Sequence, residues 1–137
     1  MDRRDLQELS KVRLREARAL LGLGFYDGAY YLAGYAVECA LKSCIAKRTQ
    51  RHEFPDKKRV DSAYSHDLRS LLKVAELSDA LLERAHGDDV FARNWATVQS
   101  WSEQSRYNRN QAKSAKDLLM AVSARDHGIL SWLRLYW

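Results

Sequence analysis

The sequence predicts an all-α domain, folded as an up-and-down antiparallel bundle of four main helices and one short helix. Hydrophobic side chains make up 46% of the residues, which is enough for a core, and 30% of the residues are charged. One proline and six glycines are too few chain breakers for a β-sandwich or a disordered chain. Apolar residues also recur at helical spacing. We expect residues 1–137 to form a single domain, since this length is usual for one core.

Two long helices are expected in the first third of the chain. The first should run from about Leu6 to Leu23, with Gly24 ending it. After a turn at residues 24–27, the second helix should continue to about Arg48. Small side chains recur along this second helix and permit close packing of its neighbours, which predicts that it is central: Ala29, Ala33, Ala36, Ala40 and Cys44.

The middle of the chain is expected to contain a loop and two shorter helices. The segment Thr49–Tyr64 breaks the apolar pattern and contains Pro55, which predicts an exposed loop. Ser65 is a suitable N-cap for a third helix that reaches Ala75. A short helix capped by Ser78 should end near Gly87.

The last third is expected to hold two helices separated by a polar segment. Asp88 or Asp89 should start a helix that passes through Trp101. The polar segment at residues 102–110 follows. The final helix should begin between Gln111 and Ser114 and continue to Trp137.

Several functional classes are disfavoured by the sequence. No apolar leader follows Met1, and the longest nearly uncharged stretch, Gly28–Val37, is shorter than the roughly 20 residues of a bilayer-spanning helix. We therefore expect a cytoplasmic protein without membrane contact. Cys39 and Cys44 lie five positions apart on one helix, point to different faces and cannot form a disulfide. No histidine stands at metal-ligand spacing and no phosphate-binding glycine loop is present, so neither a metal nor a cofactor is expected.

Charged residues are unevenly distributed along the chain. Residues 42–59 contain seven bases and two acids, and residues 106–116 contain four bases and no acid. Residues 76–89 contain five acids and one arginine. Such asymmetry suits an anionic ligand or partner, although it is also typical of a solvated surface.

Three residues of the central region are secondary site candidates: Glu38, Lys42 and His66. On an exposed helix face, an acid and a base four residues apart attract each other weakly. If Glu38 faces the interior instead, it needs a partner, because an isolated buried carboxylate is strongly unfavourable. Lys42, His66 and the segment around Arg106 are the candidate partners. We expect His66 to be neutral and to hold the start of the third helix through a hydrogen bond, and a structural role is the simpler interpretation of all three.

The best candidate for ligand binding is the polar segment from Trp101 to Lys113. Arg106 and Arg109 offer guanidinium groups that grip phosphates, and Lys113 adds a third positive charge. Tyr107 offers an aromatic face on which a base can stack. The same residue types also serve as ordinary anchors between a loop and a bundle, and this second interpretation stays open.

Three short motifs resemble the HEPN family (higher eukaryotes and prokaryotes nucleotide-binding domains): Tyr26-Asp-Gly-Ala29, Ala36-Val-Glu-Cys-Ala-Leu-Lys42 and His66-Asp-Leu68. Trp101 and Arg106-Tyr107 stand where family members carry their functional arginine. The resemblance implies an up-and-down helical bundle that is usually dimeric. It also implies that ribonuclease members carry an arginine, then four to six residues, then a histidine, which face a dimer cleft.

This chain departs from the ribonuclease pattern. No histidine follows Arg106 as far as Lys113, so the imidazole that metal-free RNA cleavage requires is missing there. Arg59 and His66 have the right spacing but lie in the wrong part of the chain. The variant resembles HEPN proteins that bind nucleotides or RNA, or that pair with a minimal nucleotidyltransferase, without cleaving.

Three hypotheses follow from the sequence. The first is a homodimeric, non-catalytic module that binds a nucleotide or RNA. The second is an interaction partner of a nucleotidyltransferase in a toxin–antitoxin pair. The third is a metal-independent ribonuclease toxin with a non-standard active site.

Overall fold

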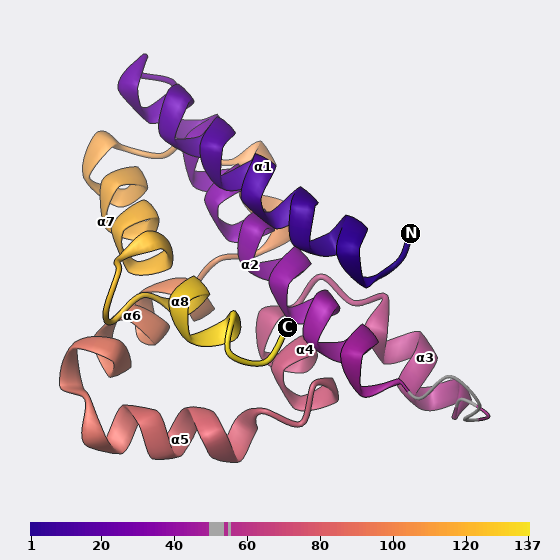
Figure 1. Cartoon of the computed structure of the whole chain (residues 1–137). Coiled ribbons are helices and arrows are strands. Elements are labelled where there is room, and N and C mark those ends of the chain that lie inside the picture. The colour runs from indigo at the N-terminus through magenta and orange to yellow at the C-terminus, as the bar shows by residue number, and fades with distance from the viewer. Residues whose placement is uncertain (50–53, 55) are drawn as a thin grey trace.

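The computed structural model describes residues 1–49, 54 and 56–137. In this part of the chain every regular element is a helix, so the all-α prediction is confirmed (Figure 1). The first helix, α1 (Arg3–Gly22), begins earlier than Leu6 because Asp2 and Asp5 form a capping box. Each carboxylate accepts a hydrogen bond from the backbone N–H of the other residue, at 2.8 and 3.0 Å.

The second helix, α2 (Tyr26–Arg48), runs antiparallel to α1 and lies beside it (Figure 1). Gly24 closes the turn between the two helices in the left-handed region, with φ of 83°. α2 contacts α1, α4, α7, α8 and the short helix η1, and is buried over most of its circumference. It is therefore the central helix, as the stripe of small side chains predicted.

The segment expected to be a loop contains a helix, α3 (Lys57–Ala63), which the apolar pattern did not predict. Asp56 caps it by accepting a hydrogen bond from the backbone N–H of Lys58. Other residues of the expected loop, 50–53 and 55, lie outside the described part of the chain.

The next helix, α4 (Leu68–Val74), starts later than expected. Its N-cap is Asp67, whose carboxylate accepts from the backbone N–H of Arg69 at 3.3 Å. Ser65 lies before the helix, where its hydroxyl accepts from the backbone N–H of Asp67 at 3.0 Å. Ser65 therefore orients the cap residue instead of capping the helix itself.

Two helices and a short 3₁₀ helix follow. They are α5 (Ser78–Gly87), α6 (Asp89–Gln99) and η1 (Glu103–Tyr107). Leu77, not Ser78, occupies the N-cap position of α5. The polar segment predicted between helices thus has regular structure of its own.

The expected final helix is interrupted. It consists of α7 (Ala112–Ser123) and α8 (Ile129–Leu133), joined by a turn at residues 124–128. A β-carbon at Gly128 would lie 2.2 Å from the carbonyl oxygen of Ala124, so only glycine permits this tight turn. The prediction of one continuous helix is wrong here because contacts with distant helices hold the turn.

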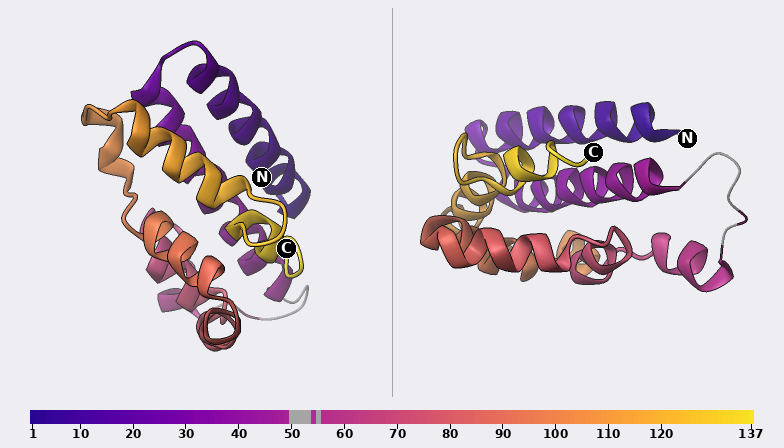
Figure 2. Two further views of the ribbon diagram at one scale, coloured as in Figure 1. Left: turned by 90° about the vertical axis from the view of Figure 1, so that its left-hand side faces the viewer. Right: turned by 60° about the horizontal axis from the view of Figure 1, so that its bottom comes forward.

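The helices form layers around α2. α1 lies on one side of α2, while α4, α5 and α6 lie on the other side (Figure 2). α7 packs against both α2 and α6 and so links the two sides. The two ends of the chain lie close together, since the Arg3 guanidinium donates to the Trp137 carbonyl at 2.8 Å. None of the described helices has the length and apolar character needed to cross a bilayer.

Candidate functional site

The segment containing Arg106 is held against the amino-terminal half of α2. Trp101 is buried, and its ring lies so close to Gly34 that a β-carbon there would come within 2.2 Å of it. The ring also packs near Tyr31, with the ring centroids 6.0 Å apart. On the far side of η1, the backbone N–H of Asn110 donates to the Asp27 carboxylate. Both ends of the segment are thus fixed to α2.

Glu38 faces the interior of the bundle. It is 2% exposed, and two partners share its carboxylate. The Nδ1 atom of His66 lies 2.9 Å from one oxygen, and the Lys42 ammonium lies 3.6 Å from the other. A buried carboxylate with a hydrogen bond and an ion pair is stable where an isolated one is not. The structure therefore brings all three secondary candidates together.

Glu103 connects this cluster to Arg106. One of its carboxylate oxygens lies 3.7 Å from the Nε2 atom of His66, and the other lies 3.6 Å from the Arg106 guanidinium. The result is a row of alternating basic and acidic side chains, called here the row of charges, that joins α2, the start of α4 and η1: Lys42, Glu38, His66, Glu103 and Arg106.

Arg106 is the accessible end of this row. Its side chain is 44% exposed, and its guanidinium lies over the Tyr107 ring, 4.8 Å from the centroid. The pKa of Arg106 is raised above its ordinary value, chiefly by the neighbouring Tyr107 and to a smaller extent by Glu103. Arg106 is thus a permanent, oriented positive charge at the surface.

Arg109 and Lys113 are not part of the row of charges that ends at Arg106. Arg109 is exposed in the turn after η1. Lys113 lies in the first turn of α7, and its ammonium pairs with Asp117 at 2.6 Å on the same helix. The structure therefore keeps these two cations on the surface beyond η1, where they contribute long-range charge and no defined geometry.

The family model of the HEPN domain matches residues 4–126. The chain belongs to the HEPN family. Neither the search of curated proteins nor the search of solved structures found a match. The resemblance seen in the sequence is confirmed, and it extends over most of the helices of the bundle.

In this HEPN domain the row of charges contains one imidazole, that of His66, and it does not come from the element that carries Arg106. His66 precedes α4, whereas Arg106 lies on η1, and only the Glu103 carboxylate lies between them in the row. Both His66 and Arg106 are candidates from the sequence alone, whereas Glu103 is not among them. The sequence could have indicated Glu103 through its position three residues before Arg106, since an acid and a base at this spacing lie close together on a helical turn.

Buried polar atoms of the η1 region also lack partners in the described part of the HEPN domain. They are the indole nitrogen of Trp101, the Ser105 hydroxyl and the side-chain nitrogen of Asn110. Buried polar groups are nearly always hydrogen-bonded in native proteins. This segment therefore has hydrogen-bonding capacity that its own fold does not use.

The basic segment at residues 42–59 is partly neutralised. Lys42 pairs with Glu38, and Arg48 pairs with Glu76 at 3.0 Å. A groove of about 540 Å³ runs between the start of α1, the end of α2 and α3, with Lys42 and Arg59 in its walls. Arg51 lies outside the described residues. At least two of the seven bases of this segment are therefore paired with acids.

The two cysteines do not take part in chemistry at this site. Cys39 and Cys44 are buried free thiols, and burial raises the pKa of each to about 12. A protonated thiol is a poor nucleophile and a poor metal ligand. The described residues also contain no group of three metal-binding side chains.

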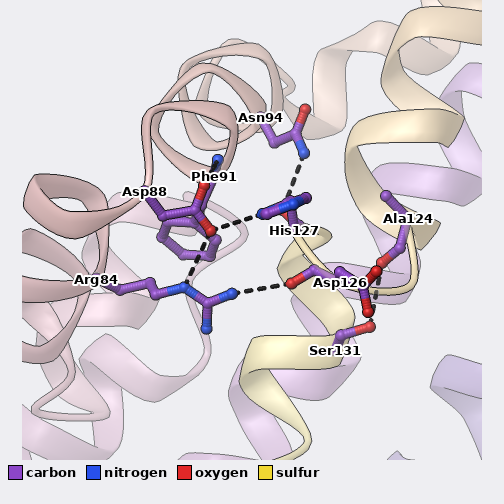
Figure 3. Close-up of polar contacts among 8 residues, drawn as sticks. All are labelled: Arg84, Asp88, Phe91, Asn94, Ala124, Asp126, His127 and Ser131. Atoms are coloured by element: carbon purple, nitrogen blue, oxygen red, sulfur yellow. Dashed lines mark hydrogen bonds and ion pairs between the residues drawn. The ribbon is translucent and has the colours of Figure 1, made fainter.

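A second polar cluster, which no sequence motif indicates, fixes the turn between α7 and α8 (Figure 3). The Asp88 carboxylate contacts Nδ1 of His127 at 2.7 Å and Nε of Arg84 at 3.3 Å. Arg84 also donates to the Asp126 carbonyl, and Asn94 donates to the His127 carbonyl, each at 2.9 Å. These contacts account for the interruption of the predicted final helix.

Proposed function

We propose that this HEPN domain is a non-catalytic, homodimeric module that binds the phosphate groups of a nucleotide or RNA at the Arg106 segment. The observation that carries the proposal is the half-exposed Arg106 guanidinium stacked on the Tyr107 ring. A guanidinium fork matches two phosphate oxygens, and an exposed tyrosine beside it accepts a base by stacking.

The surroundings of Arg106 support this proposal. Its anchors on α2 keep the segment in place before any ligand arrives, which lowers the entropy cost of binding. The exposed Arg109 and Lys113 add positive charge nearby in the chain, which favours encounter with an anion.

Binding is favoured over catalysis because RNA cleavage without a metal uses both an acid and a base. His66 is the one imidazole in the row of charges that ends at Arg106, and its Nδ1 atom is held by Glu38. Among the other described histidines, His86 lies on α5 and His127 contacts Asp88. Neither of them forms an ion pair with Glu103 within the described part of the chain.

The test is titration of a fluorescently labelled single-stranded RNA with the purified protein, followed by anisotropy. The Arg106→Ala variant should lose about tenfold or more in affinity, as expected for a charge-assisted phosphate contact. Wild-type binding should weaken steeply as salt rises, because phosphate contacts release counterions.

A matched control removes an equal charge elsewhere. Arg125 is exposed in the turn after α7. Arg125→Ala should change the affinity by less than about twofold, since an exposed charge that does not contact the ligand contributes only a screened, long-range attraction. Equal losses in both variants, or no binding by the wild type at low salt, would contradict the proposal.

One observation favours a second function, ribonuclease activity. The buried Glu38 orients the imidazole of His66, as acids orient catalytic histidines in many enzymes, and Arg106 lies beyond Glu103. The same samples should therefore be checked for RNA shortening. Shortening by the wild type that disappears in both His66→Asn and Arg106→Ala would replace the binding proposal by catalysis.

A further inference from the structure

The Glu103 carboxylate lies between two side chains that both bind anions. It is 3.6 Å from the Arg106 guanidinium and 3.7 Å from Nε2 of His66. We propose that a phosphate group displaces this carboxylate and bridges Arg106 and His66, so that Glu103 is a built-in competitor of the ligand. This inference rests on the proposed function and adds His66 as a second phosphate contact.

The contacts of Glu103 are those of an anion that can be displaced. Both distances exceed the usual range of a strong charge-assisted hydrogen bond. Its side chain is 30% exposed. Glu103 is also the first residue of η1, a 3₁₀ helix of five residues, and the hydrogen bonds of a 3₁₀ helix are weaker than those of an α-helix. By contrast, Glu38 binds the same imidazole at 2.9 Å from a buried position. Glu38 therefore positions His66, whereas Glu103 makes only longer contacts from a partly exposed position.

The contact with Glu38 also determines which ring nitrogen of His66 carries a proton. An ionised carboxylate only accepts hydrogen bonds, so the Nδ1 atom of His66 carries the proton in the contact with Glu38. The Nε2 atom then faces Glu103 and is a donor only when the imidazole is positively charged. A phosphate held by Nε2 therefore contacts the positively charged form of the imidazole, as Glu103 does.

The charges around His66 favour this exchange. Glu38 contacts it from α2 and pairs with Lys42 on the same helix. Glu103 contacts it from η1, where Arg106 lies beyond, and Asp67 follows it in the chain. Within the row, the two acids and the two permanent bases cancel when Glu103 is in place. When Glu103 rotates away and His66 is charged, the row has a net positive charge that a phosphate neutralises.

The first measurement is RNA affinity in Glu103→Gln. The amide keeps the size of the side chain but removes the competing charge, so the variant should bind labelled single-stranded RNA about five- to tenfold more tightly. Glu83→Gln is the control, because Glu83 is an exposed acid on α5, outside the row of charges that ends at Arg106, and the substitution is of the same type. It should change the affinity by less than about twofold.

The second measurement is the RNA affinity of His66→Asn. This substitution keeps a donor for Glu38 but has no group in place of Nε2. The variant should therefore bind labelled single-stranded RNA several-fold more weakly than the wild type, because the second phosphate contact is lost. Thermal melting of each variant confirms that it is folded.

A third arm identifies the source of the phosphate. Competition by ATP that equals competition by an unlabelled RNA of the same phosphate concentration indicates that a terminal phosphate is sufficient. Competition by RNA alone indicates an internal phosphodiester. In either case the ligand that competes should bind more tightly to Glu103→Gln than to the wild type.

The outcomes separate the two proposals. If Arg106→Ala weakens binding while Glu103→Gln does not strengthen it, the Glu103 inference is wrong and the binding function stands. If Arg106→Ala binds RNA as the wild type does, the proposed function itself is wrong. An unchanged RNA affinity in a folded His66→Asn variant also contradicts the role of His66.

Discussion

At the scale of single residues, local hydrogen bonds and ion pairs set the behaviour of the carboxylates. Asp88 shows this most clearly, because it caps α6 through the backbone N–H of Phe91 and also contacts His127 and Arg84 (Figure 3). These contacts lower the pKa of Asp88 to about 2, with the Phe91 hydrogen bond as the largest cause and the His127 hydrogen bond as the next. The ionised form of Asp88 is therefore the form that stabilises the fold.

The Asp88→Asn variant should melt at a lower temperature than the wild type at neutral pH. Asparagine is an equally good N-cap, so the difference reports the lost charge. A lowered pKa stabilises the fold above the unfolded value of about 4, and this stabilisation disappears as the pH falls towards 2. The melting temperatures of the two proteins should thus converge between about pH 4 and pH 2.

The control for this prediction is Asp67→Asn. Asp67 caps α4 in the same way but has no ion pair with a base among the described residues. Its substitution should lower the melting temperature at neutral pH less than Asp88→Asn does. An equal effect of the two substitutions would show that the loss of a negative charge at a helix N-terminus, and not the loss of the contacts with Arg84 and His127, accounts for the effect of Asp88→Asn.

At the scale of elements, the packing of η1 on α2 decides where Arg106 lies. Gly34 has no side chain, and the Trp101 ring occupies the space next to it. Trp101 closely precedes η1, so its position determines the position of the segment that carries Arg106. A glycine inside a helix is intrinsically unfavourable, and close packing is the reason that this one is needed.

Gly34→Ala should destabilise the protein by about 2 kcal/mol, the usual cost of overpacking a core, despite the better helix propensity of alanine. It should also weaken RNA binding, because Trp101 and η1 must move. Gly22→Ala is the matched control, since a β-carbon at this position, at the end of α1, would meet no atom within 4 Å. Chemical denaturation should show a change within about 0.5 kcal/mol for Gly22→Ala. Unchanged stability of Gly34→Ala would contradict the packing argument.

At the scale of the whole molecule, exposed apolar side chains favour self-association. Leu23 and Phe25 are exposed at the turn between α1 and α2. Asp27, next to this turn, binds the backbone of Asn110, so the apolar turn lies beside the segment after η1. Exposed apolar surface of this kind is typical of protein interfaces.

We therefore expect the protein to sediment with twice the mass of one chain, through an interface that includes this turn. Replacing Leu23 and Phe25 by serine should shift the protein towards the monomer. Leu135→Ser, which alters another exposed leucine near the other end of the chain, should leave the dimer intact. A monomeric wild type, or dissociation by Leu135→Ser alone, would exclude this interface.

Much of the fold was predictable because helix formation depends on neighbours in the sequence. Apolar spacing and small side chains located α1 and the central α2, and the aspartates at positions 88 and 89 marked the start of α6. The errors occurred where distant contacts override local preference. Arg84 and Asn94 hold the turn after α7, which the apolar spacing alone would continue as a helix.

The sequence by itself determined that this chain is an all-α HEPN domain, and it located Arg106, Glu38 and His66 as polar candidates. Only the tertiary structure decided that Glu38 is buried and that His66 approaches it from 28 residues away. The same packing brought Glu103 between His66 and Arg106. The physical reason is that helical periodicity is a local property, whereas a row of charges across three elements exists only after the helices pack.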